Sequence, residues 1–314
     1  MNESQRTLPQ SSYDDEIDLR DLFRVVWAGK WLIVAITSAA IVIAVIIAMV
    51  LPNTYRAEAL LAPNDQQGAE GLSALAAQYG GLASLAGINI GGDATDKTTL
   101  GLEILKSRKF ISEFVARHDL LVPLIAARGW RSETGDLIID ADDYDLASGE
   151  WIRDASPPRK SIPSMQEAHE EFLRIMSASE DKKTGFITLS VEHYSPTLSK
   201  QWVDWLVEDI NSTIMAQDVA EAQQAIDYLR DQIESTSVAD LRVVFSSLIE
   251  EQIKIVMLAR VSPEYVFRTV DPAVVPEIKA KPRRVLIAFL GLLLGSLAGI
   301  IIVFVRNSII LEGE

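Results

Sequence analysis

The chain has 314 residues, a formal net charge of −15 at neutral pH and no cysteine. The lack of cysteine excludes disulfides, thiolate nucleophiles and cysteine-ligated zinc. The negative charge disfavours contact with phosphate backbones, so we expect no nucleic-acid partner.

Two uncharged apolar runs lie near the two ends of the chain, at residues 31–51 and 285–305. A helix of this length is roughly 31 Å long, which matches the hydrocarbon core of a bilayer. We therefore expect two membrane helices. The alternative for the first run is a cleaved signal peptide. It fits less well because the leader is acidic and the apolar part of a signal peptide is shorter.

Basic residues on one side of the first run predict the topology. Arg20, Arg24 and Lys30 precede it, and the positive-inside rule then places the N-terminus in the cytoplasm. The predicted order is a cytoplasmic segment (1–30), a first span (31–51), an outward-facing domain (52–284), a second span (285–305) and a cytoplasmic tail (306–314). The outward-facing domain is periplasmic if the source is a Gram-negative bacterium.

A basic cluster just before the second span conflicts with that topology. It consists of Lys279, Lys281, Arg283 and Arg284. Long translocated domains cross largely regardless of charge, so we keep the topology. The cluster is suited to anchor the helix end or to bind anionic lipid headgroups.

The sequence between the spans predicts an α+β base domain. Partial or clean alternation of polar and apolar residues at 55–61, 185–191 and 265–270 indicates three strands, which we expect to form one sheet close to the membrane. Helical spacing of apolar residues indicates helices at about 99–119 and 164–178. Two segments are expected to be irregular. One is the Gly/Ala-rich loop at 64–99, with at most one short helix at 72–86, and the other is the stretch at 130–163.

A 66-residue stretch, residues 197–262, contains neither glycine nor proline and carries a helical apolar stripe. It predicts a long helical arm that turns at 234–238, where side chains compete with the backbone for hydrogen bonds. We expect an outward helix, a returning helix at about 240–260, and sharing of the stripe between neighbouring subunits. The stripe residues chosen for arm packing are Trp202, Leu206, Ile210, Ile226, Leu229 and Ile233.

No motif predicts catalysis, a metal site or a cofactor site. The acidic segment at 136–145 contains Asp140, Asp142, Asp143 and Asp145. It lacks the glycine and ligand spacing of a calcium loop, so a solvated acidic loop is the preferred interpretation. The three histidines show no ligand or triad spacing, and there is no phosphate-binding glycine loop.

Three glycines in the second span, Gly291, Gly295 and Gly299, recur at every fourth position. This spacing lets two helix backbones approach closely. We expect the glycines to support association between subunits. The alternative is contact with the first span of the same chain.

Together these features resemble the Wzz chain length determinant proteins, which are polysaccharide co-polymerases. The resemblance extends from about residue 16 to residue 306 and is strongest from 197 onward. Its most specific part is the proline-rich segment before the second span, with Pro272, Pro276 and Pro282, which leads through the basic cluster into the glycine-rich span.

The resemblance implies a non-catalytic inner-membrane regulator of the modal length of lipopolysaccharide O-antigen or a related surface glycan. It also implies a ring of identical subunits, commonly an octamer, that acts beside a Wzy-type polymerase on undecaprenyl-pyrophosphate-linked glycan. Three alternatives stay open. A co-polymerase for capsule or exopolysaccharide would work with a kinase on a separate polypeptide, and a co-polymerase for a glycan like enterobacterial common antigen belongs to the same alternative without that kinase. A transmembrane sensor would need an output module, which neither short end can hold. A glycan-transferring enzyme would turn over lipid-linked sugar unaided.

Overall fold

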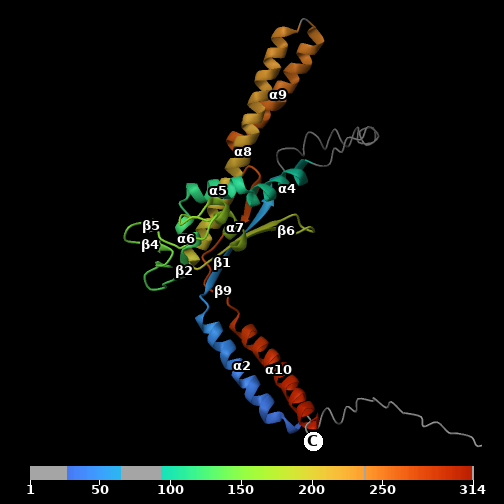
Figure 1. Cartoon of the computed structure of the whole chain (residues 1–314). Helices are drawn as coiled ribbons and strands as arrows, with labels where there is room; N and C mark the ends of the chain where they lie inside the picture. Colours follow the sequence, from blue (N-terminus) through green and yellow to red (C-terminus); the bar gives the residue numbers. More distant parts are fainter. Residues whose placement is uncertain (1–26, 65–92, 237, 313–314) are drawn as a thin grey trace, which may run out of the picture. The chain divides into compact units, whose positions relative to one another are not determined.

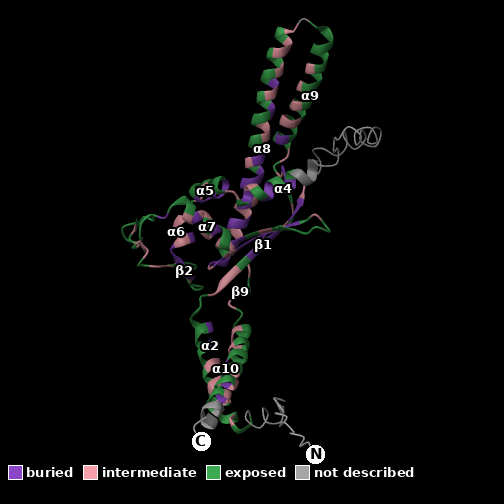
Figure 2. Cartoon of the chain, turned by 45° about the vertical axis from the view of Figure 1, so that its right-hand side comes forward, coloured by how far each residue is buried: buried purple, intermediate pink, exposed green. Residues whose placement is uncertain are grey.

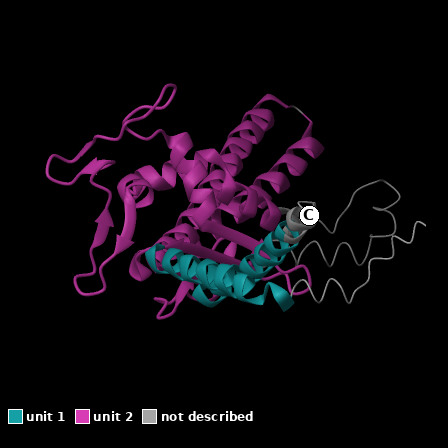
Figure 3. Cartoon of the chain, turned by 60° about the horizontal axis from the view of Figure 1, so that its bottom comes forward, with its two compact units in different colours: residues 1–51, 282–314 teal, residues 52–281 magenta. Residues whose placement is uncertain are grey.

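The computed structural model describes residues 27–64, 93–236 and 238–312. The chain divides into two compact units (Figure 3), one formed by Met1–Leu51 with Pro282–Glu314 and the other by Pro52–Lys281. The Gly/Ala-rich loop at 64–99, with its expected helix at 72–86, falls mostly outside the described residues.

In the part of the first unit that the structure describes, two helices lie together, α2 (Lys30–Val50) and α10 (Arg284–Glu312). Both contain a stretch long and apolar enough to cross a membrane, Lys30–Val50 and Arg284–Arg306. These bounds differ by one residue from those expected from the sequence. However, α10 continues through most of the expected tail, because no glycine or proline interrupts residues 306–312.

The second unit contains an antiparallel five-stranded sheet in the order β6-β7-β1-β8, with β9 also paired to β1. Its strands are β1 (Thr54–Pro63), β6 (Met176–Glu180), β7 (Ile187–His193), β8 (Phe267–Asp271) and β9 (Lys279–Lys281). The three strands expected from the sequence are confirmed as neighbours in this sheet. The expected α+β class is confirmed as well.

Helices cover the apolar side of the sheet (Figure 1). They are α4 (Asp93–Lys106), α5 (Arg108–Arg117), α6 (Leu121–Ile125), α7 (Met165–Ile175) and the first half of α8. The expected helix at 99–119 is two helices, because the Ser107 hydroxyl caps α5 by accepting a hydrogen bond from the Phe110 amide. The expected helix at 164–178 ends earlier, because Met176 enters β6 and pairs with β7.

Two short hairpins interrupt the segment that was expected to be irregular. Strand β2 (Ala127–Trp130) pairs with β3 (Leu137–Ile139), and β4 (Tyr144–Asp145) pairs with β5 (Glu150–Trp151). The acidic segment at 136–145 therefore connects and partly forms these hairpins.

Two antiparallel helices of the second unit lie side by side, α8 (Pro196–Ser235) and α9 (Ala239–Val261) (Figure 1). Ser195 caps α8 through its hydroxyl, and Pro196 occupies the first helical turn, where a missing N–H costs nothing. Helix α8 ends at Ser235 and α9 begins at Ala239, so the break between them falls within the turn predicted at 234–238. Residues 220–261, here called the arm, are mostly exposed or half-buried, whereas the start of α8 is buried (Figure 2).

Candidate functional site

The glycines of the second span make a close contact with α2 in the first unit. A Cβ added to Gly291 would lie 2.6 Å from the Cβ of Ala44, and one added to Gly295 would lie 2.7 Å from the Cβ of Ala40. A Cβ on Gly299 would lie 3.1 Å from the Cα of Ile33. Only glycine allows this approach of the two backbones. The structure thus places the glycine face against the first span of the same chain, and its role between subunits stays a prediction.

The proline-rich segment follows the sheet edge. Pro272 and Pro276 lie between β8 and β9, and Pro282 follows β9 directly. Proline cannot donate a ladder hydrogen bond. The segment accordingly does not pair with β1 between β8 and β9. After β9 the chain continues into α10.

The residues chosen for arm packing fall into two environments. Trp202, Leu206 and Ile210 have no exposed surface and belong to the base core. Ile226 is buried in the arm, while Leu229 and Ile233 are half-buried there. The first three were expected in the arm but lie in the base, because the first half of α8 packs on the sheet before the helix continues outward.

Asn211 connects α8 to the start of β8, and sequence analysis missed it. Its side-chain oxygen accepts hydrogen bonds from the amides of Val266 and Phe267 at 2.7 and 2.9 Å. Its amide nitrogen donates to the carbonyls of Val207 and Phe267, both at 3.0 Å. A buried asparagine in an apolar helical stripe is the signal that could have found it.

A second polar contact joins the root of the arm to the base. The Tyr265 hydroxyl donates to Asp218 at 2.7 Å, and the Lys97 amino group lies 3.1 Å from the same carboxylate oxygen. Burial and the neighbouring Asp218 carboxylate raise the pKa of Tyr265. The phenol therefore stays neutral and donates its hydrogen bond to Asp218. Through this carboxylate, α8 contacts both α4 and the segment before β8.

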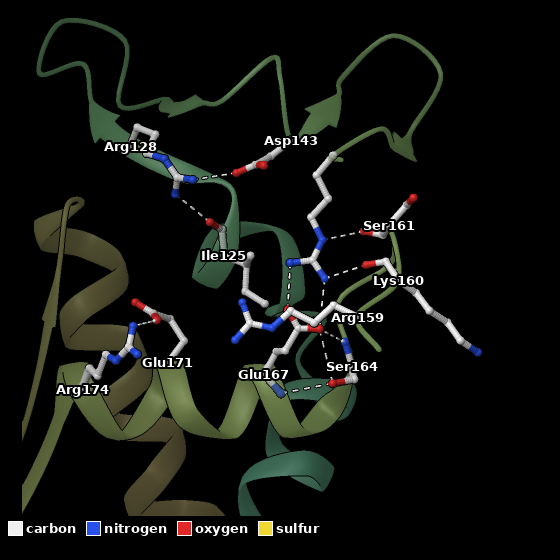
Figure 4. Close-up of polar contacts among 11 residues, drawn as sticks. Ile125, Arg128, Asp143, Arg159, Lys160, Ser161, Ser164, Glu167, Glu171 and Arg174 are labelled. Carbon is white, nitrogen blue, oxygen red and sulfur yellow. Dashed lines mark hydrogen bonds and ion pairs between the residues drawn. The ribbon is translucent and has the colours of Figure 1, made fainter. Parts of the chain in front are cut away.

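The base contains a polar cleft of about 560 Å³. Its lining includes both signs of charge from α7, β7, β9 and residues 127–163, namely Arg128, Asp143, Arg153, Asp154, Arg159, Glu167, Glu170, Glu171, Arg174, Glu192 and Lys281. In Figure 4 the Arg128 guanidinium is directed at Asp143, Arg159 lies beside Glu167, and the Arg174 guanidinium is directed at Glu171. Ion pairs thus form part of the cleft lining.

Arg153 holds the segment that precedes α7. Its guanidinium contacts both carboxylate oxygens of Glu167, at 2.8 and 3.0 Å, and also donates to the carbonyls of Lys160 and Ser161 (Figure 4). The Arg153 hydrogen bonds hold the pKa of Glu167 below its usual value. Glu167 also closes the capping box with Ser164 at the start of α7. This cluster fixes backbone conformation.

The acidic segment has structural partners, which corrects the expectation of a merely solvated loop. The Arg128 guanidinium lies 3.2 Å from Asp140 and 2.6 Å from Asp143. Asp145 accepts a hydrogen bond from the Ser148 hydroxyl, which lowers the pKa of its carboxyl group. Among the residues that the structure describes, no group of histidine and carboxylate side chains has the geometry of a metal site.

Comparison with known families identifies both ends of the chain. Residues 15–118 match the model of the chain length determinant protein Wzz, a stretch that contains α2, β1, α4 and α5. Residues 244–308, from α9 into α10, match the G-rich domain found on putative tyrosine kinases. The resemblance to the Wzz family of polysaccharide co-polymerases is thereby confirmed, with the Wzz match itself at residues 15–118. The proline segment and the glycine face, where the resemblance was expected to be most specific, lie inside the second match instead.

Two solved structures are also similar to this chain. A full-length bacterial polysaccharide co-polymerase is 16% identical, with 93% of this chain and 98% of that chain covered and a TM-score of 0.38. A fragment of the polysaccharide co-polymerase WzzB from Salmonella Typhimurium is 13% identical, with 73% and 100% covered and a TM-score of 0.30. No curated protein matches the chain.

Proposed function

We propose that this protein is a non-catalytic regulator that sets the modal length of lipopolysaccharide O-antigen or a related surface glycan. The observation that carries the proposal is the Wzz match, which spans the first membrane helix and the first strand of the base. The second match, which leads into the second membrane helix, supports it.

The proposed mechanism depends on assembly rather than on chemistry. Identical subunits would form a ring in the bacterial inner membrane, and an octamer is the subunit number to test first. Both termini would be cytoplasmic, and the base and arm would be periplasmic. The ring would act with a Wzy-type polymerase on undecaprenyl-pyrophosphate-linked glycan. The exposed apolar side chains of the arm support an interface between copies. They include Tyr228, Val243, Val244, Met257 and Val261.

The decisive experiment is a deletion strain examined for its lipopolysaccharide ladder. We expect loss of the modal length distribution and its return when the gene is supplied on a plasmid. A ladder that is unchanged by deletion would contradict the O-antigen role. The purified protein should also leave lipid-linked sugar unchanged in the absence of a polymerase, and turnover would contradict the non-catalytic proposal.

A second candidate follows from the match to a domain named for putative tyrosine kinases. The chain would then serve capsule or exopolysaccharide synthesis together with a kinase on a separate polypeptide. The same deletion strain separates the two candidates. A normal lipopolysaccharide ladder with capsule or exopolysaccharide of altered length would favour this second function.

A further inference from the structure

The segment between β8 and β9, residues 272–278, bulges from the edge of the sheet. Asp271 pairs with Leu60 and Lys279 pairs with Tyr55. Between these two pairs the segment advances by eight residues, whereas β1 advances by only five. The surplus chain must leave the ladder, and we call residues 272–278 the edge loop.

The edge loop presents apolar side chains to solvent. Ile278 is 83% exposed, Val274 is 68% exposed and Val275 is 48% exposed, whereas Ala273 is buried in the base core. The edge loop is thus held in the base core by Ala273, while Val274, Val275 and Ile278 are exposed to solvent. Exposed apolar side chains grouped in this way mark surfaces that contact a partner or a membrane.

Cations follow the apolar side chains directly. Between residues 271 and 284 the sequence has four cations, Lys279, Lys281, Arg283 and Arg284, and two carboxylates, Asp271 and Glu277. This local excess of positive charge stands in a chain of net charge −15. The Lys281 amino group lies 2.6 Å from Glu192. Apolar side chains flanked by lysine and arginine are the combination that binds the headgroup region of anionic bilayers.

The chain itself keeps the edge loop near the bilayer. Helix α10 begins at Arg284, six residues after Ile278. Six residues span at most about 20 Å, and the headgroup region on each side of the hydrocarbon core is roughly 5–8 Å thick. Tyr55, which is opposite Lys279 in the sheet, packs edge-on against Trp130 at 5.7 Å. Tyrosine and tryptophan are enriched where proteins meet this region.

We propose that residues 274–283 dock onto anionic lipid headgroups at the bilayer surface that α10 enters. The contact couples the edge of the base sheet to the membrane independently of the two spanning helices. The proposal rests on α10 crossing the membrane and does not depend on a role in glycan length.

A single-cysteine experiment tests the contact in the full chain, which has no cysteine of its own. Ile278→Cys carries a fluorescent label in nanodiscs that contain phosphatidylglycerol with a headgroup spin label. Val243→Cys, at a 68% exposed position on α9, is the matched control. We expect at least threefold stronger quenching at position 278. Equal quenching at the two positions overturns the proposal. So does a label at 278 that is shielded from aqueous iodide but not quenched by lipid, because a protein partner would then cover the loop.

A charge series tests the choice of anionic lipid. Lys279→Gln with Arg283→Gln removes two cations and leaves the Lys281–Glu192 pair intact. It should reduce the ratio of docked to undocked label by about fivefold per cation. Glu277→Gln is the control of opposite sign and should raise that ratio. Quenching that is the same in phosphatidylcholine as in phosphatidylglycerol would overturn the assignment to anionic headgroups.

Discussion

Helix α8 passes through two environments. Trp202, Leu206 and Ile210, in its first half, have no exposed surface and pack in the core of the base. Beyond residue 220 the same helix exposes Tyr228 by 64%, and of the residues of α9, all of which the structure describes, only Ala259 is buried. The base satisfies its apolar residues within one chain. The arm does not, so its apolar surface is available to other copies, as the proposed ring requires.

The largest expected effect is at the buried end of this comparison. Trp202 packs on Phe172 with ring centroids 5.9 Å apart and on His193 at 4.8 Å. Trp202→Ala should lower the free energy of unfolding of the base by about 3–5 kcal/mol, because it removes a large side chain from a filled core. Urea-dependent proteolysis in detergent measures this loss. Leu248→Ala, at a 41% exposed position of α9, is the control and should change it by less than about 0.5 kcal/mol.

Breaking the arm should separate its role from that of the base. Ala222 is buried inside the arm portion of α8. Ala222→Pro removes a helical hydrogen bond and should cost about 3 kcal/mol or more, locally. We expect protein that inserts and assembles through its base but gives a short or unregulated glycan ladder. A ladder of normal length would mean that the arm takes no part in length control.

A substitution at Asn211 tests whether one buried side-chain amide holds β8 in the base. Asn211→Leu keeps the size but leaves the amides of Val266 and Phe267 without an acceptor. The expected loss is about 1–3 kcal/mol in the free energy of unfolding. Hydrogen exchange should show faster exchange in β8 than in β6. Equal exchange in both strands would show that β8 is held by its ladder alone.

Acid should destabilise the base through His193. Burial lowers the pKa of His193 in the folded state below its ordinary value of 6.5, so the unfolded chain binds the proton more readily. Stability from this group is present above about pH 6.5 and is lost as the pH falls toward the folded pKa, by up to about 1.4 kcal/mol per unit. Urea unfolding at several pH values measures this slope. His193→Gln should flatten it, and an unchanged slope would assign the effect to other groups.

The smallest effect is expected in the acidic hairpin segment. The triple variant with alanine at Asp140, Asp142 and Asp145 leaves Asp143 in contact with Arg128, which is half exposed. Exposed ion pairs contribute about 0–1 kcal/mol. Stability and glycan ladder should both remain close to those of the parent. Complete loss of length control in a normally expressed and assembled variant would contradict the non-catalytic proposal.

The sequence alone determined the features that depend on local pattern. Apolar runs of bilayer length located α2 and α10, alternation located the strands near residues 55, 187 and 267, and competing polar side chains located the turn between α8 and α9. The motifs near the second span also carried the family resemblance, which the Wzz match confirms. Each of these signals is contained in a short stretch of chain.

Only the tertiary structure decided which surface each residue meets. The apolar stripe of α8 has one period throughout, so its spacing cannot show that Trp202 faces a sheet and Tyr228 faces solvent. The spacing of Gly295 likewise permits any helix partner, and the fold supplies Ala40 of the same chain. Asn211 acquired its role from two amides more than fifty residues away. Periodicity fixes the face of a helix, whereas its neighbour depends on contacts between segments that are distant in the chain.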